Sequence, residues 1–144
     1  MILLLTGLLA GLLDAAAALL FFLARGNKQP GMLFRYIASG VFGPAAFGPG
    51  KRMVALGVLF HFLIALFWVG VFFGAYPWVL LLHADPLVVA AGYGLLVWVI
   101  MNLVVLPLSR VKPRPFSVSF IVVNILILVV TIGLPCVYMA HIWE

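Results

Sequence analysis

The chain has 144 residues, of which 67% are hydrophobic and 8% charged, and so few charges cannot cover the surface of a soluble domain of this size. The net charge of +5 does not indicate nucleic-acid binding, because the basic residues stand in short connections or at the ends of apolar segments, where membrane topology accounts for them. The single cysteine, Cys136, cannot form an intrachain disulfide. The composition therefore predicts one all-α integral membrane domain over residues 1–144, embedded in a lipid bilayer.

The N-terminal apolar segment predicts the first membrane span, over Ile2–Ala24. A signal peptide is the alternative, but it would begin with basic residues, whereas Arg25 follows this apolar run. We therefore expect a retained helix. One face of this helix is rich in small residues, which let helices approach closely in a membrane; it comprises Gly7, Gly11, Asp14, Ala15 and Ala18.

The next segment, residues 31–50, is apolar but holds an arginine, two prolines and five glycines. If it crossed the bilayer, Lys51 would lie opposite Arg25, and Arg35 would be placed within the membrane at a cost of a few kcal/mol. We expect a short helix over about Met32–Phe42 at the cytoplasmic interface, from which Arg35 extends to lipid headgroups, followed by a Gly/Pro turn. A shallow re-entrant loop is the alternative.

Three further spans are predicted over about Lys51–Gly74, Pro86–Leu108 and Ser117–His141, which completes a bundle of four transmembrane helices. The connection before the last span carries Arg110, Lys112 and Arg114, whereas the preceding connection has no Lys or Arg. Basic residues mark cytoplasmic connections, so residues 25–52 are also expected inside and both termini outside. The aromatic residues expected at the outer interface are Tyr76, Trp78, Tyr138 and Trp143.

Each predicted span carries one strongly polar residue well inside its ends: Asp14, His61, Asn102 and Asn124. Helical spacing places each beside residues expected to face the bundle interior. In the second span that face comprises Gly57, His61, Ala65 and Trp68. In the third it comprises Ala91, Leu95, Trp98 and Asn102. In the fourth a heptad stripe comprises Ser117, Asn124, Thr131 and Tyr138.

The depth of these residues predicts a polar site inside the bundle. Asp14 and His61 lie near the centres of their spans, and we expect them to meet within hydrogen-bond reach, directly or through one water. Asn102 and Asn124 lie roughly 7 Å toward the cytoplasm and fit interhelical hydrogen bonds. An Asp–His pair can hold one proton between two sites, as a relay requires, or it can be a structural contact.

The remaining candidates are weaker. His83 and His141 are expected at the outer edge, where they could ligate a metal or haem. The sequence contains no catalytic triad, phosphate loop or zinc motif, so it indicates no resident metal or cofactor and favours a protein that is not an enzyme.

Four stretches carry a resemblance to a known family: GLLAGLLDAAAALLFF, RYIASGVFGPAAFGPG, LGVLFHF and MNLVVLPLS. Together they resemble the YagU-like small bacterial inner-membrane proteins, a family without an established biochemical activity. The resemblance implies a bacterial cytoplasmic (inner) membrane and a compact helical bundle, and it assigns no catalytic residue.

The leading functional hypothesis is a protein that passes a proton, ion or small solute through its polar seam, as a homo-oligomer. The alternatives are a structural or accessory protein that binds partner helices, and a haem-binding or lipid-modifying membrane protein.

Overall fold

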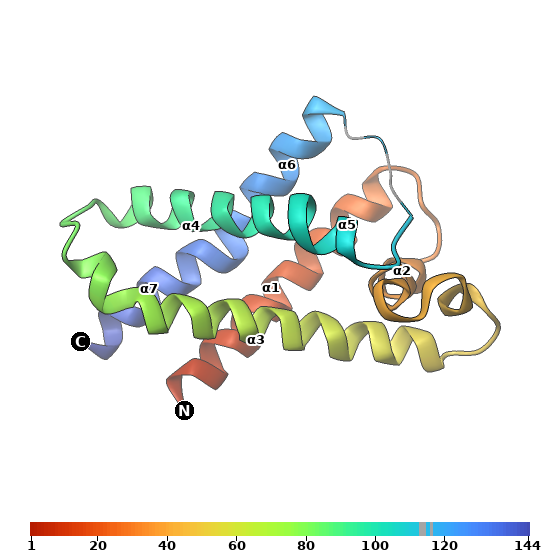
Figure 1. Cartoon of the computed structure of the whole chain (residues 1–144), viewed down its shortest axis with the longest axis horizontal. Helices are drawn as coiled ribbons and strands as arrows, with labels where there is room; N and C mark the ends of the chain where they lie inside the picture. Colours follow the sequence, from red (N-terminus) through yellow and green to blue (C-terminus); the bar gives the residue numbers. More distant parts are fainter. Residues whose placement is uncertain (113–114, 116) are drawn as a thin grey trace.

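The computed structural model describes residues 1–112, 115 and 117–144, and every regular element within this part of the chain is helical (Figure 1). Four helical segments in it are long and apolar enough to cross a membrane. Two of them are single helices, α1 (Ile2–Ala24) and α3 (Arg52–Leu80). The third joins α4 (Pro86–Ile100), a π-helical turn η2 (Met101–Val105) and α5 (Leu106–Leu108); the fourth joins α6 (Val118–Leu128), a π-helical turn η3 (Val129–Gly133) and α7 (Leu134–Trp143). The predicted all-α class with four helices of membrane-spanning length is confirmed.

The ends of these helices differ from the prediction mainly in the second one. The limits Ile2–Ala24 and Pro86–Leu108 are those expected, but α3 continues beyond Gly74, through Pro77, to Leu80. Pro77 removes one backbone hydrogen bond, yet the residues around it remain apolar and continue the helix, which shortens the connection to α4. Arg114, assigned to the last connection, lies outside the described residues.

Both π-helical turns precede a proline. Leu106 stands before Pro107 and donates its N–H to the Met101 carbonyl, and Leu134 stands before Pro135 and donates to the Val129 carbonyl. Proline has no N–H and crowds the carbonyl four residues back, and a π-helical turn accommodates this by taking up an extra residue.

The heptad stripe predicted for the fourth span is wrong at Tyr138, because the turn η3 lies within that span. Thr131 is buried at 4% exposure, but Tyr138, seven residues later, is 68% exposed. One extra residue rotates the following side chains by about 100°, so the interior stripe ends at Thr131.

Residues 31–50 do not form a long helix. Helix α2 (Gly31–Phe42) is followed by a 3₁₀-helix, η1 (Gly43–Phe47), which confirms the short helix that ends before Pro44. In Figure 1, α2 is seen nearly end-on beside the N-terminal half of α3. The two backbones touch at Gly57, where a Cβ atom would lie 2.5 Å from the carbonyl carbon of Phe34.

We expected the side chain of Arg35 to extend to lipid headgroups. Instead, it turns back onto the chain. Its Nη1 donates to the carbonyls of Ala46 at 3.0 Å and Gly48 at 2.6 Å, and its Nη2 donates to the carbonyl of Gly50. Three carbonyls of the Gly/Pro turn therefore share one guanidinium, which holds the turn against α2.

Helix α1 packs against α3 on one side and against η3 and α7 on the other, while α4 packs mainly on η3. The hydrophobic core lies where these contacts meet and includes Ala10, Val69, Phe72, Ala90, Ile132, Cys136, Val137 and Ala140. Helices α3 and α4 are linked across this core by Tyr93, whose hydroxyl donates to the Trp68 carbonyl. Because α1 lies between α3 and η3, the side chain of Asp14 on α1 can contact residues of both α3 and η3.

Candidate functional site

Close packing of α1 on α3 places Asp14 of α1 against His61 of α3. Gly11 is buried at this contact, and a Cβ atom there would lie 2.8 Å from a ring carbon of Phe62. Asp14, three residues later, lies on the same side of α1 and contacts His61 of α3 and Thr131 of η3. We call Asp14, His61 and Thr131, with the Gly11 carbonyl, the polar cluster.

Thr131 lies within hydrogen-bond distance of two acceptors. Its Oγ1 is 2.9 Å from Oδ1 of Asp14 and 2.7 Å from the carbonyl oxygen of Ile127, one helical turn earlier. A hydroxyl has one hydrogen and can also accept. When Asp14 is a carboxylate, Thr131 can donate to it; when Asp14 is a carboxylic acid, it can donate to Thr131, whose hydrogen then goes to Ile127.

His61 faces Asp14 but is held by a different partner. Its Nε2 is 2.8 Å from the Gly11 carbonyl oxygen and therefore donates its hydrogen there, because a carbonyl can only accept. The same Nε2 lies 3.9 Å from Oδ2 of Asp14, beyond a direct hydrogen bond. The side chains of His61 and Asp14 are 11% and 16% exposed. The structure thus brings the two residues together without the direct hydrogen bond.

The two asparagines are hydrogen-bonded within their own helices. Asn102 donates from Nδ2 to the Trp98 carbonyl at 2.9 Å, and Asn124 donates from Nδ2 to the Phe120 carbonyl at 3.0 Å. Both amide nitrogens therefore bind the carbonyl four residues back. Neither asparagine is among the residues that contact Asp14 or His61 in the described hydrogen bonds and ion pairs, so their predicted interhelical role stays a prediction.

The predicted interior face of the third span is confirmed at Trp98 but is displaced by one position at Ala91 and Leu95. Ala90, Gly94, Val97 and Trp98 are buried, whereas Ala91 is exposed and Leu95 is 46% exposed. A Cβ atom at Gly94 would lie 2.7 Å from the Cα atom of Val129, so this glycine determines which face of α4 meets η3.

The two outer histidines have local partners. Nδ1 of His83 donates to the Leu81 carbonyl at 3.0 Å, and Nδ1 of His141 lies 3.5 Å from a carboxylate oxygen of Glu144. Within the described residues, no three His, Cys, Asp or Glu side chains are grouped as a metal site requires. The haem and metal hypotheses therefore gain no support from these residues.

Sequence reasoning placed Thr131 on the interior stripe but did not include it in the site. Its position four residues before Pro135 is a usable signal, because proline disturbs the helix at that carbonyl. The role of the Gly11 carbonyl could not be foreseen, since a backbone acceptor has no side chain to mark it.

The fold and the polar cluster define an all-α protein with four helices long and apolar enough to span a membrane, and with a polar cluster to which three of its helical segments contribute side chains. Comparison with known protein families, curated proteins and solved structures gives no match for this chain.

Proposed function

We propose that the chain is a multi-pass membrane protein whose polar cluster binds and releases a proton as part of a relay through the bundle. One observation carries the proposal: the Thr131 hydroxyl is within hydrogen-bond distance of both the Asp14 carboxyl, at 2.9 Å, and the Ile127 carbonyl, at 2.7 Å. Asp14 can therefore be hydrogen-bonded both with and without its proton.

His61 supports the same interpretation. In the described geometry its Nε2–H is bonded to the Gly11 carbonyl, with Oδ2 of Asp14 3.9 Å from Nε2. A shift of about 1 Å would bring Nε2 into hydrogen-bond range of a charged Asp14. An unsatisfied charge inside a membrane is costly, so two partners that can change their hydrogen bonds lower the cost of moving a proton.

The membrane setting is supported by composition and charge. The four long helices are apolar, and the described basic residues stand at the end of the bundle formed by the end of α1, the start of α3 and the segment after α5. Basic residues favour the cytoplasmic side, so we place this end inside and both termini outside. The resemblance noted above supports the bacterial cytoplasmic membrane.

Proton flux into liposomes tests the proposal. Purified protein is reconstituted with a trapped pH-sensitive dye, and the rate of internal pH change is measured after an external pH step. Asp14→Asn keeps the shape but removes the ionisable carboxyl, so the flux should fall to that of protein-free liposomes.

Asp85→Asn is the matched control, because Asp85 is an N-cap whose carboxylate accepts from the N–H of Leu87 and asparagine caps equally well. This variant should conduct like the wild type. A wild type without flux, or an Asp14→Asn variant with undiminished flux, would refute the relay.

A structural or accessory function is the second candidate, and an apolar groove favours it. The groove lies between α3 and the end of the third helical segment, has a volume of about 260 Å³ and is lined by Leu63, Ile64, Phe67, Trp68, Met101 and Val105. A helix of a second copy would fit its chemistry and would give the homo-oligomer expected from the sequence. Phe67 is 62% exposed, so Phe67→Cys in a background without Cys136 should form disulfide-linked dimers when a thiol oxidant is added to the membranes, if the groove is an interface.

A further inference from the structure

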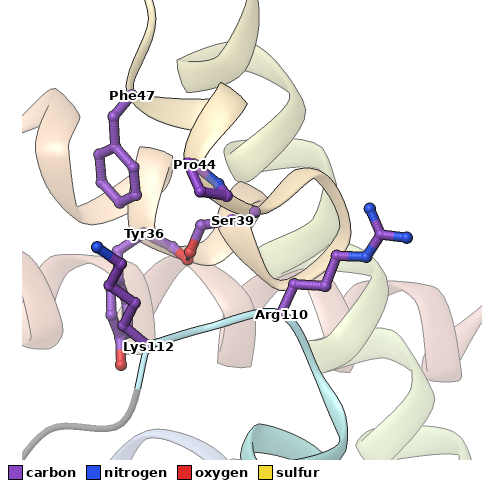
Figure 2. Close-up of a pocket in the computed structure, with 7 residues that line it drawn as sticks. Tyr36, Ser39, Pro44, Phe47, Arg110 and Lys112 are labelled. Carbon is purple, nitrogen blue, oxygen red and sulfur yellow. Dashed lines mark hydrogen bonds between the residues drawn. The ribbon is translucent and has the colours of Figure 1, made fainter.

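A second cavity, separate from the polar cluster, opens at the basic end of the bundle. It has a volume of about 320 Å³ and lies between α2, η1 and the segment that follows α5 (Figure 2). Its walls include Tyr36, Ser39, Pro44, Phe47, Arg110 and Lys112. Sequence reasoning assigned Arg110 and Lys112 to membrane topology alone, and the proposed relay uses none of these residues.

Backbone contacts hold the walls of this cavity in place. The N–H of Arg110 donates to the Gly40 carbonyl at 3.1 Å, which joins α2 to a segment about seventy residues later in the chain. Gly40 also faces this segment, since a Cβ atom there would be in ordinary van der Waals contact, at 3.6 Å, with a methyl carbon of Val111. A second wall of the cavity is η1, which begins at Gly43. The φ angle of Gly43 is 59°, in a region of backbone conformation that glycine adopts readily.

The cavity carries positive charge and no acidic side chain. The whole sequence has three acidic residues: Asp14 belongs to the polar cluster, while Asp85 and Glu144 stand at the start of α4 and after α7. Figure 2 shows the Lys112 ammonium group on the side of Phe47, whereas the Arg110 guanidinium points away from the other labelled residues. Rotation of the flexible Arg110 side chain would bring a second cation to an anion bound at Lys112.

The apolar part of the cavity distinguishes a lipid from a small soluble anion. Phe47 and Pro44 line the cavity, and both are exposed, Phe47 by 47%. An anion with attached acyl chains would satisfy the cations and cover these apolar side chains, whereas inorganic phosphate would leave them in water. The cavity also lies at the ends of the long helices, where headgroups would be in the proposed membrane setting.

We propose that this cavity binds the phosphate group of an anionic phospholipid, with Lys112 and Arg110 as its cationic contacts and Phe47 and Pro44 against the start of the acyl chains. This inference rests on the proposed membrane location but not on the proton relay. Such a site would fix α2 and the segment after α5 to the headgroup layer of the cytoplasmic leaflet.

Native mass spectrometry of the purified full-length chain in detergent tests the site. The probes are phosphatidylglycerol, phosphatidylcholine with the same acyl chains, and inorganic phosphate. The wild type should retain phosphatidylglycerol in preference to phosphatidylcholine, and phosphate should not displace the lipid. Lys112→Gln and Arg110→Gln should each weaken phosphatidylglycerol binding about fivefold, as expected for one cation near an anionic lipid surface.

Arg52→Gln is the matched control, since Arg52 is exposed at the same end of the bundle but does not line the cavity. It should leave binding unchanged, and Lys112→Arg should retain it, while circular dichroism checks that every variant is folded. Equal loss in Arg52→Gln, equal retention of phosphatidylcholine, or normal binding by the Arg110/Lys112 double variant would overturn the proposal. Displacement of the lipid by phosphate would assign the site to a soluble anion instead.

The same experiment separates this proposal from the relay. Asp14→Asn should bind phosphatidylglycerol like the wild type whatever its proton flux, because Asp14 is not part of the cavity. A chain that does not fractionate with membranes would end both proposals together.

Discussion

Replacing Gly57 by alanine should separate α2 from α3. The added Cβ would lie 2.5 Å from the carbonyl carbon of Phe34 and 3.0 Å from its Cα atom. Carbon atoms in ordinary contact are ~3.5–4.0 Å apart, so the backbone of α2 must move by about 1 Å. No rotamer change can relieve this overlap, because both partners are backbone atoms.

We expect Gly57→Ala to lower the free energy of unfolding by about 1–3 kcal/mol, the usual cost of overpacking. Gly70 provides the control on the same helix, since a Cβ atom there would have no neighbour within 4 Å. Gly70→Ala should be neutral or stabilise by up to about 1 kcal/mol, because alanine is the better helix former. Unfolding is followed by the loss of helical circular dichroism during titration with sodium dodecyl sulfate.

A second measurement reports where the structure has opened. Ala38 is fully buried and lies four residues after Phe34, on the same face of α2, so Ala38→Cys in a background without Cys136 should react slowly with a thiol reagent and faster once Gly57→Ala is added. If Gly57→Ala is as stable as Gly70→Ala and leaves the cysteine protected, α2 does not pack on α3 as described, and the argument fails.

Three further outcomes are expected. Thr131→Val removes a hydrogen-bond partner of Asp14 and should lower stability in the same detergent titration by about 0.6 kcal/mol and at most ~1.7; a loss several times larger would contradict a simple hydrogen-bond role. Arg35→Lys replaces a guanidinium that serves three carbonyls and should cost about 1–3 kcal/mol and speed trypsin cleavage after Lys51, the residue that directly follows the Gly/Pro turn, whereas unchanged cleavage would show that the turn holds itself. In a cysteine-free background, Lys28→Cys should be labelled only from the cytoplasm and His83→Cys only from outside, and labelling of both from one side would reject the proposed orientation.

The helices could be predicted from the sequence because apolar length is a strong and local property. The limits Ile2–Ala24 and Pro86–Leu108 needed only a long apolar run with polar or turn-forming residues at its ends. The end of α3 could not be found in this way. The predicted span ended at Gly74, but an interior proline such as Pro77 removes only one hydrogen bond, and the apolar residues on both sides continue the helix to Leu80.

The packed faces were harder to predict, because they depend on helix phase. Heptad spacing correctly placed Thr131 inside, but it failed at Tyr138 because η3 takes up an extra residue. On α4 the choice between Ala90 and Ala91 is a difference of one position, and it was decided by the close approach of Gly94 to Val129. Neither effect is visible in the hydrophobicity of a single helix, since both arise where two helices meet.

The two ionisable residues of the candidate site could be predicted because such residues are unusual inside apolar helices. A carboxyl and an imidazole inside apolar helices are expensive in a membrane, so Asp14 and His61 stood out in the sequence, and the structure brings them to 3.9 Å. Their hydrogen-bond partners did not stand out, because the Gly11 and Ile127 acceptors are backbone carbonyls and Thr131 is a common residue in apolar helices.

These backbone acceptors bear on the choice between the two hypotheses considered for the cluster, proton exchange and a structural contact. The Nε2–H of His61 is bonded to Gly11 and would reach Asp14 after a shift of about 1 Å, and the hydrogen of Thr131 can go to Ile127 or to Asp14. A purely structural contact needs only one of these arrangements, since a fixed carboxyl requires fixed donors. A site that gains and loses a proton needs both, because each protonation state of Asp14 requires a different set of donors. The presence of an alternative acceptor beside each donor is therefore the feature that favours proton exchange over structural bonding alone.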